Sequence, residues 1–174
     1  MEWDAEYMMK NNFSFSQQLL DFAERNSVSF IYASSASVYG GGKKFEEIRE
    51  NENPINLYAF SKYLFDQLVR QKVKANKIQI VGLRYFNVYG PNESHKGQMA
   101  SVAYHLHQQL KEGNDLKLFE GSGGFSPGEQ KRDFIYVDDV VKVNLWFMNN
   151  PDVSGIFNVG TGKSQTFNAV SFTH

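Results

Sequence analysis

The chain of 174 residues contains no cysteine and only four prolines. Without cysteine it forms no disulfide, no thiolate metal centre and no thiol nucleophile. Its charges nearly cancel, with 18 Lys and Arg residues against 19 Asp and Glu residues, which gives no electrostatic basis for binding nucleic acid or an anionic membrane. No segment approaches the ~20 consecutive apolar residues that a membrane-spanning helix needs. We therefore expect neither a nucleic-acid partner nor a membrane partner.

A glycine-rich phosphate-binding turn is also missing. The pattern G-x-G-x-x-G between a strand and a helix cradles the pyrophosphate of a dinucleotide, and none of the 14 glycines forms it. Residues 40–42 are glycines in a charged segment that opens no helix, and Gly121, Gly123 and Gly124 precede a proline. Either the chain does not act on a dinucleotide, or the piece that carries this turn is absent from it.

Apolar residues are plentiful, at 41% of the chain, and 15% of the residues are aromatic, which is enough for a core of one domain. Their spacing predicts helices over 13–25, 57–71, 99–110 and 138–148, with Asp138 as the N-cap of the last. It predicts strands over 28–33, 78–86, 116–119, 134–137 and 155–159, and surface loops over 40–53 and 122–130. Trp146 and Phe147 are predicted core residues. This alternation of strands and helices is typical of an α/β fold with a parallel sheet.

One set of polar residues carries recognisable chemistry. Ser35 stands at the end of a predicted strand, and Tyr58 and Lys62 open the helix that follows. An ammonium beside a tyrosine favours its phenolate form, and a serine hydroxyl can polarise an alcohol or a carbonyl. Together these groups can move a proton while a nicotinamide cofactor moves a hydride. Ser34 and Ser37 are alternatives to Ser35.

Several segments carry a family resemblance: ASSA at 33–36, YAFSK at 58–62, LRYFNVYGP at 83–91, HKG at 95–97, MASVA at 99–103, LFEGS at 118–122, KRDF at 131–134, NLWF at 144–147 and GIFN at 155–158. They resemble the extended short-chain dehydrogenase/reductase superfamily, and within it the NAD-dependent epimerases of nucleotide sugars. The resemblance implies a partial, Rossmann-like parallel sheet with a small α/β substrate-binding portion. Residues 1–90 would be the remainder of the NADP-binding domain, and 91–174 would mix substrate-binding segments with late Rossmann elements. It also implies that the chain is an internal fragment of the family's fold, so that the strand at 28–33 faces an unpaired edge.

The resemblance implies roles for individual residues. The catalytic set would be Ser35, Tyr58, Lys62 and a second acid/base, Lys96. Contacts to the cofactor would come from Asn11, Tyr58, Lys62, Val88 and Lys96. Contacts to the substrate would come from Ser35, Asn87, Gln98 (where the family has a serine), His105, Phe119, Glu120, Gly121, Ser122 and Arg132. The loop between Ser122 and Lys131 is longer than the family's usual form. We expect no metal site, because His105 and His107, two residues apart, point to different sides of a helix.

The implied activity is the epimerisation of an ADP-activated heptose at C6 through a transient ketone. NADP is the expected cofactor, with NAD as the alternative, because the residue that reads the ribose 2′ position belongs to the absent segment. The implied setting is lipopolysaccharide synthesis in the cytoplasm of a Gram-negative bacterium, and the implied assembly is a homo-oligomer. Two alternatives stand beside this interpretation: a catalytically inert fragment, and another nucleotide-sugar epimerase or dehydratase.

Overall fold

We describe a computed structural model of the chain, covering residues 4–75, 77–113, 116, 120, 121 and 124–171. The chain divides into two compact units. The first unit runs up to Tyr85 and takes in Lys142–Val159, and the second holds Phe86–Val141 and the residues from Gly160 onwards. Each is described by itself below.

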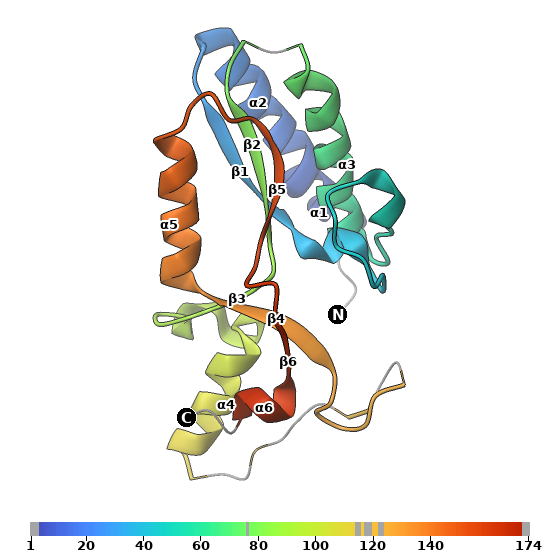
Figure 1. Cartoon of the computed structure of the whole chain (residues 1–174), viewed down its shortest axis with the longest axis vertical. Helices are drawn as coiled ribbons and strands as arrows, with labels where there is room; N and C mark the ends of the chain where they lie inside the picture. Colours follow the sequence, from blue (N-terminus) through green and yellow to red (C-terminus); the bar gives the residue numbers. More distant parts are fainter. Residues whose placement is uncertain (1–3, 76, 114–115, 117–119, 122–123, 172–174) are drawn as a thin grey trace. The chain divides into compact units, whose positions relative to one another are not determined.

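The first unit is built on a parallel sheet of three strands in the order β1-β2-β5. The strands are β1 (Phe30–Ser35), β2 (Ile80–Tyr85) and β5 (Gly155–Val159) (Figure 1). Within the described residues, β1 pairs only with β2, in a register that places Phe30 opposite Ile80. The predicted α/β class with a parallel sheet is therefore confirmed.

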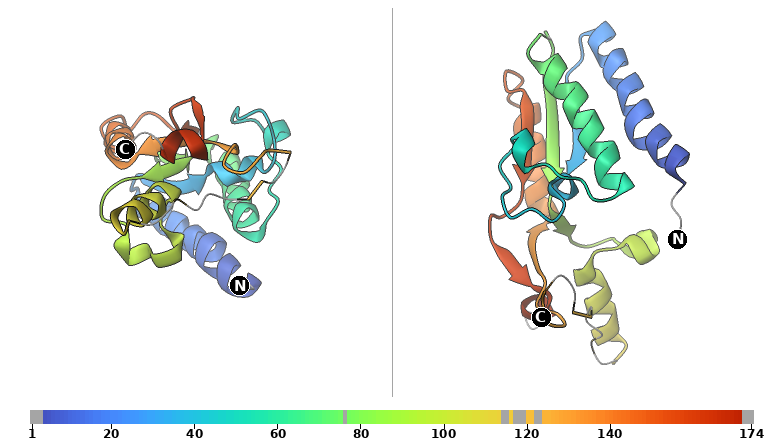
Figure 2. Two further views of the ribbon diagram at one scale, coloured as in Figure 1. Left: turned by 90° about the horizontal axis from the view of Figure 1, so that it is seen from below. Right: turned by 90° about the vertical axis from the view of Figure 1, so that its right-hand side faces the viewer.

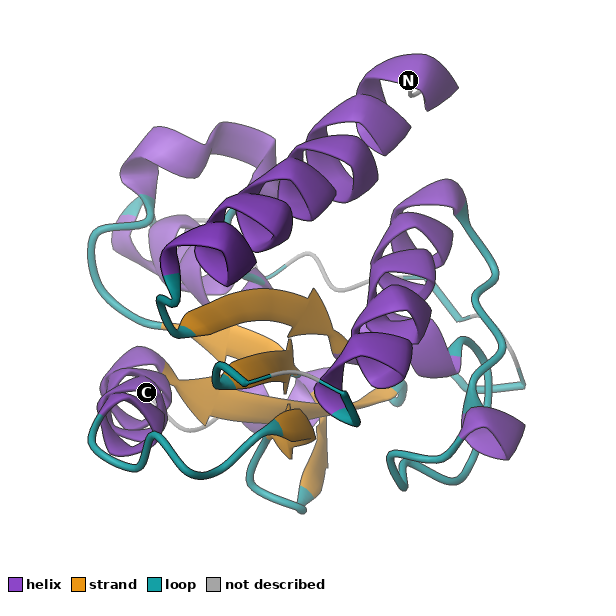
Figure 3. Cartoon of the chain, turned by 90° about the horizontal axis from the view of Figure 1, so that it is seen from above, coloured by secondary structure: helices purple, strands orange, loops and turns teal. Residues whose placement is uncertain are grey.

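Helices cover both faces of this sheet. On one face lie α2 (Phe15–Asn26) and α3 (Leu57–Val73) (Figure 2, right), and on the other lies the part of α5 (Val137–Met148) that belongs to this unit (Figure 3). Ahead of α2 come α1 (Ala5–Met9) and η1 (Lys10–Ser14), a π-helical turn that joins α1 to α2. The side chain of Asn56 caps α3 by accepting a hydrogen bond from the Ala59 N–H at 2.8 Å, which fixes where this helix begins.

The core lies between the sheet and the pair α2 and α3. Leu20, Phe65, Val69 and Ile80 form a fully buried cluster. Tyr32 packs edge-on against the Phe65 ring with centroids 4.7 Å apart. This burial of apolar surface seats α3 on β1 and β2 and so determines where its polar residues lie.

A loop follows β1 and returns to its own start. After the short turns η2 (Ala36–Tyr39) and η3 (Arg49–Asn51), the Asn53 N–H donates to the Val38 carbonyl at 2.9 Å. The exposed residues 41–50 bear out the predicted surface loop. Its ends are anchored, because Val38 and Tyr39 are buried and the Glu52 side chain has no solvent exposure.

The second unit holds β3 (Asn87–Tyr89), β4 (Lys131–Tyr136) and β6 (Ser164–Thr166), with β4 parallel to β3 and antiparallel to β6. Its helices are η4 (Ser94–Met99), α4 (Val102–Lys111) and α6 (Phe167–Ser171). The Ser101 hydroxyl caps α4 by accepting from the Tyr104 N–H at 3.1 Å.

Some predicted elements need correction. The helix predicted from residue 99 begins at Val102, because Ser101 caps it there. Helix α5 begins at Val137, so Asp138 lies in its first turn and is not its N-cap. Trp146 is 52% exposed and not a core residue. Successive helical residues point about 100° apart, and the face toward the sheet is taken by Phe147, whose ring is tilted against that of Phe157 with centroids 4.9 Å apart. Of the strand predicted over 116–119, residues 117–119 lie outside the described residues.

Candidate active site

The residues Tyr58 and Lys62 lie one turn apart at the start of α3, in the first unit. The Lys62 ammonium stands 6.0 Å from the centroid of the Tyr58 ring and donates a hydrogen bond to the Ala33 carbonyl of β1 at 3.0 Å. Tyr58 is 41% exposed. Burial lowers the pKa of Lys62, and the carboxylate of Asp66 opposes this shift.

Ser35 ends β1 beside this lysine contact, two residues beyond Ala33. Its hydroxyl accepts hydrogen bonds from the Ser37 N–H at 3.2 Å and the Ser37 hydroxyl at 2.9 Å. Its own proton remains available to a substrate oxygen. Ser34, one of the alternatives to Ser35, is buried and donates to Asp66 at 2.9 Å, so its proton is already committed.

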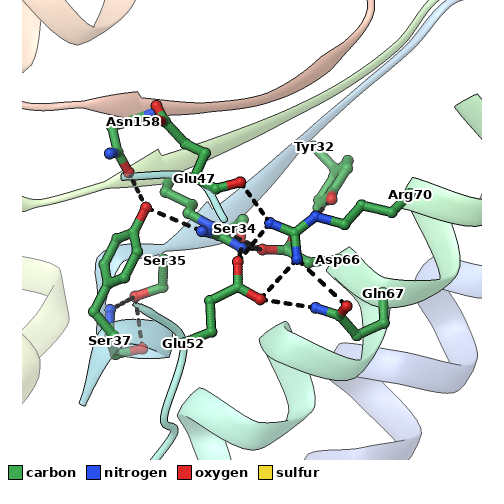
Figure 4. A network of polar contacts seen from close by, with 12 residues as sticks. Tyr32, Ser34, Ser35, Ser37, Glu47, Glu52, Asp66, Gln67, Arg70 and Asn158 are labelled. Atoms are coloured by element: carbon green, nitrogen blue, oxygen red, sulfur yellow. Dashed lines mark hydrogen bonds and ion pairs between the residues drawn. The ribbon is translucent and has the colours of Figure 1, made fainter. Parts of the chain in front are cut away.

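A buried ion-pair network joins α3 to β1 and β2 in the same unit (Figure 4). The Asp66 carboxylate, on α3, accepts from Arg84 of β2, at 2.9 Å to Nε and 2.8 Å to Nη2. It also accepts from the Tyr32 hydroxyl at 2.8 Å. Arg84 and Asp66 have no exposed side-chain surface, so the contacts join three elements of the unit in a medium where charge pairs must be matched.

The same network holds the loop after β1. Glu52, also without exposed surface, bonds Arg84 and Arg70 at 2.5 Å each. Arg70 in turn donates to the Glu47 carbonyl at 2.9 Å. Two guanidinium groups thus face two carboxylates, and the cluster is close to neutral.

Burial and hydrogen bonds shift the pKa values of this cluster in opposite directions. Burial raises the pKa of the Asp66 carboxyl, against the opposing charge of Arg84. Burial would also raise the pKa of Glu52, but hydrogen bonds from Arg70 and Arg84 outweigh it and lower that pKa overall. The pKa of Tyr32 lies well above its ordinary value, because the ring is buried and its hydroxyl faces the Asp66 carboxylate.

Asn11, predicted to contact a cofactor, lies in the π-helical turn η1 and is exposed. Its side-chain amide donates to the Tyr7 carbonyl at 3.0 Å. The next residue, Asn12, reaches α3 instead, donating to the Ser61 hydroxyl at 3.1 Å. Single π-helical turns occur frequently at functional sites, and this one lies against the helix that carries Tyr58 and Lys62.

In the second unit, Lys96 stands in η4 with its side chain 45% exposed. Its ammonium lies 3.3 Å from Glu93, a side chain only 4% exposed. Glu93 also accepts from the Gly90 N–H at 3.2 Å, the Ser101 N–H at 2.8 Å and the Ser101 hydroxyl at 2.7 Å. Glu93 therefore ties together both ends of the segment that carries Lys96.

The other predicted site residues of this unit are mostly exposed. Asn87 donates to the Asp133 carbonyl at 3.0 Å, and Arg132 donates to the Lys131 carbonyl at 2.8 Å with its guanidinium 5.9 Å from the Phe167 ring. Val88 lies in β3 and His105 in α4, both half-buried; Gln98, Glu120 and Gly121 are exposed. Phe119 and Ser122 lie outside the described residues.

The sequence patterns did not single out Asp66, Arg84, Glu52 or Glu93. A signal for two of them exists, since Arg84 interrupts an apolar strand and Asp66 falls on the inner face of α3. Among the described residues, no three His, Asp or Glu side chains gather so as to hold a metal ion. A surface cavity of ≈ 740 Å³ in the first unit includes Arg70 and Gln67 in its lining but none of the predicted site residues.

Comparison with known proteins shows the family of this chain. Residues 2–160 match the NAD dependent epimerase/dehydratase family. The chain belongs to that family. It is 56% identical over 171 residues to an ADP-L-glycero-D-manno-heptose-6-epimerase of Thiobacillus denitrificans, covering 98% of this chain and 52% of that protein. It is 52% identical to the enzyme of the same name from Alkalilimnicola ehrlichii, covering 98% of this chain and 53% of that protein.

The chain is also similar to a solved structure of a protein with the same name as these two relatives. The Helicobacter pylori ADP-L-glycero-D-manno-heptose-6-epimerase superposes with a TM-score of 0.87 at 38% identity, over 98% of this chain and 52% of that one. The chain spans about half the length of the relatives it matches. In the part of the chain that the structure describes, no helix has the length and apolarity to cross a membrane.

The family's cofactor is a nicotinamide dinucleotide, and the first unit has donors suited to one end of it. The half-buried Lys62 and the exposed Tyr58 carry donors that can bond ribose hydroxyls and a carbinol. For the pyrophosphate, the described residues offer no glycine-rich turn that opens a helix after a strand. The residues therefore fit the nicotinamide-ribose end of the group.

Proposed function

We propose that this chain carries the catalytic residues of an epimerase that inverts C6 of ADP-glycero-manno-heptose, with NADP as the preferred cofactor. The observation that supports it most is the arrangement of Ser35, Tyr58 and Lys62 in a chain that is 56% identical to a relative of that name. Lipopolysaccharide core synthesis in a Gram-negative cytoplasm, and a homo-oligomeric state, are parts of the proposal that come from the resemblance.

Tyr58 is the proposed base of the oxidative half-reaction. Its phenolate takes the proton from the C6 hydroxyl, and the Lys62 ammonium stabilises that phenolate. The Ser35 hydroxyl donates a hydrogen bond to the same substrate oxygen, which gains negative charge as Tyr58 takes its proton and becomes the neutral carbonyl oxygen when hydride leaves C6. A nicotinamide cofactor supplies hydride acceptance and, later, hydride return.

Inversion needs a ketone reduced from its opposite face, and a second proton donor serves that step. We assign this role to Lys96, whose ammonium gives its proton to the carbonyl oxygen as hydride returns to C6. The reaction has no net redox change, since the hydride removed is the hydride restored. The Lys96 ammonium lies 3.3 Å from Glu93 on a side chain that is 45% exposed, and it would leave this ion pair to reach a substrate.

The remaining predicted contacts belong to binding. Arg132 presents a planar fork that suits diphosphate oxygens. Asn87, Gln98, His105, Phe119, Glu120, Gly121 and Ser122 are proposed to contact the sugar and nucleotide, and Asn11 and Val88 to contact the cofactor, as Lys62 and Lys96 do.

The test has two readouts on the purified chain: NADP binding by calorimetry, and conversion of one ADP-heptose C6 epimer into the other by proton NMR. We expect Tyr58→Phe to abolish any conversion, and Tyr63→Phe, a matched change on the same helix, to leave it intact. A folded chain that binds neither NADP nor NAD and converts nothing would contradict the proposal and leave the inert fragment. Conversion of another nucleotide sugar in its place would favour the related epimerases.

A further inference from the structure

Two sets of contacts join α3 to β1, and they lie one helical turn apart. The Lys62 ammonium donates to the Ala33 carbonyl at 3.0 Å. One turn further, the Asp66 carboxylate accepts from the Ser34 hydroxyl at 2.9 Å. Ala33 and Ser34, which are consecutive in the strand, are thus bonded by residues i and i+4 of the helix. Residues with this spacing lie on one face of a helix.

Asp66 is the better fixed of the two anchors. Its carboxylate accepts four hydrogen bonds, from Ser34 and Tyr32 of β1 and twice from Arg84 of β2. Neither Asp66 nor Arg84 is exposed to solvent. A carboxylate held from two neighbouring strands cannot slide along either without losing charge-assisted bonds, so it sets how far α3 lies along the sheet.

The position of Asp66 has two consequences for the proposed catalytic residues. The register it sets determines how Tyr58 and Lys62 stand relative to Ser35, which directly follows the gripped Ser34. Its negative charge lies one turn from the Lys62 ammonium and supports the charged form of that lysine. Among the described residues, Lys62 also faces the Tyr58 ring, and its ammonium bonds the Ala33 carbonyl.

We propose that Asp66 is a positioning residue of the active site: bonded by Ser34, Tyr32 and Arg84, it holds α3 in register with β1 and places its carboxylate one helical turn from Lys62. This inference rests on the proposed function for its catalytic meaning. Its structural and electrostatic content can be tested without any turnover.

The experiment follows the Lys62 ε-methylene signal by NMR in the full chain labelled with ¹³C-lysine, assigned with Lys62→Arg and titrated toward high pH. We expect Asp66→Asn to shift the titration of Lys62 to lower pH than in the native chain, because the opposing charge is lost while the burial remains. Glu52→Gln is the matched control, since it removes a carboxylate that bonds the same Arg84 guanidinium but lies on the loop after β1 and not on α3. It should leave the Lys62 titration where it was.

An unchanged Lys62 titration in Asp66→Asn, or an equal shift in Glu52→Gln, would overturn the inference. Should Asp66→Asn fail to fold, Ser34→Ala provides the second test, because it keeps every charge and removes only the hydrogen bond from Ser34 to Asp66. Hydrogen exchange at the Ser35 and Ser37 amides should then rise about tenfold while the amides of Ile80 and Val81 keep their rates, and equal rates at Ser35 would contradict the register role. If the variants show these effects but the native chain lacks epimerase activity, the proposed function is refuted and the positioning role of Asp66 stands.

Discussion

The Asp66 carboxylate and the Arg84 guanidinium form a two-bonded pair, at 2.9 and 2.8 Å, with no solvent exposure on either side chain. The pair joins α3 to the central strand of the sheet. With Glu52 and Arg70 it makes a cluster of two positive and two negative groups. Such a cluster adds little net stability over an apolar core, but removal of one member leaves an unmatched buried charge.

Replacing Arg84 should therefore be costly. We expect Arg84→Met to lower the free energy of unfolding by about 3–5 kcal/mol, because Asp66 and Glu52 lose their shared cation. Urea unfolding followed by circular dichroism measures this. Arg49→Met makes the same chemical change at an exposed position and should cost less than about 0.5 kcal/mol. Equal losses in the two variants would show that the buried cluster has no special role.

Glu93 should make the chain sensitive to acid. Burial would raise its pKa, but hydrogen bonds from Ser101 and Gly90 outweigh it, so the pKa in the folded chain is lowered. The carboxylate then contributes stability that is complete above the unfolded pKa of about 4.3 and is lost as the pH falls through the lower, folded value.

The variant Glu93→Gln should accordingly lose less stability than the native chain between neutral pH and about pH 3. The measurement is a series of urea unfolding curves across this range. Glu50→Gln, at an exposed position, is the control and should follow the native curve. Parallel curves for Glu93→Gln and the native chain would refute the prediction.

The start of the loop after β1 depends on a glycine. Gly40 has φ of 57°, and a Cβ there would overlap the Asn53 carbonyl oxygen, a backbone atom. We expect Gly40→Ala to cost more than about 2 kcal/mol, from left-handed strain and overlap together. Gly41→Ala, where a Cβ meets nothing within 4 Å, should change the unfolding temperature little. A similar effect of both variants would mean that the loop relaxes freely.

Gln79 donates hydrogen bonds to backbone carbonyls at the end of α5 and in the turn that links it to β5. Its buried side-chain amide donates to the carbonyls of Phe147, Asn150 and Val153 at 2.9, 3.0 and 3.1 Å. We expect Gln79→Leu to destabilise the chain by about 2–3 kcal/mol, because all three carbonyls lose this donor and those of Phe147 and Asn150 keep only a backbone N–H. Gln71→Leu on α3 is the control for the change of side chain. Differential scanning calorimetry would show whether only the first variant melts early.

Sequence patterns predicted the helices and strands of the first unit well, because the residues of these elements that face the core are apolar. The apolar run that forms β2 and the periodic face of α3 both report burial, which dominates folding. Gly155–Val159 was found as a strand at its predicted bounds. In contrast, β4 begins three residues before its predicted start, since Lys131–Asp133 are polar and pair with the equally polar β6.

The candidate site was only partly visible in the sequence. Tyr58 and Lys62 follow from their spacing on one helix, and the structure brings the ammonium to 6.0 Å from the ring. The partners Asp66 and Arg84 are 18 residues apart on different elements. No local pattern pairs such residues, because their contact is created by the crossover that sets β2 beside β1.

The π-helical turn η1 has a consequence for the helix on either side of it. A π turn fits one residue more than an α turn into a single revolution, so the helix ahead of it keeps the side that it faces relative to the helix behind it. Deleting one residue within Lys10–Ser14 would allow an unbroken α-helix from Ala5 to Asn26. Residues ahead of the turn would keep their side of the helix, and only the side chains of the turn itself would change place. The extra residue is thus confined to one turn, the turn from which Asn12 reaches Ser61.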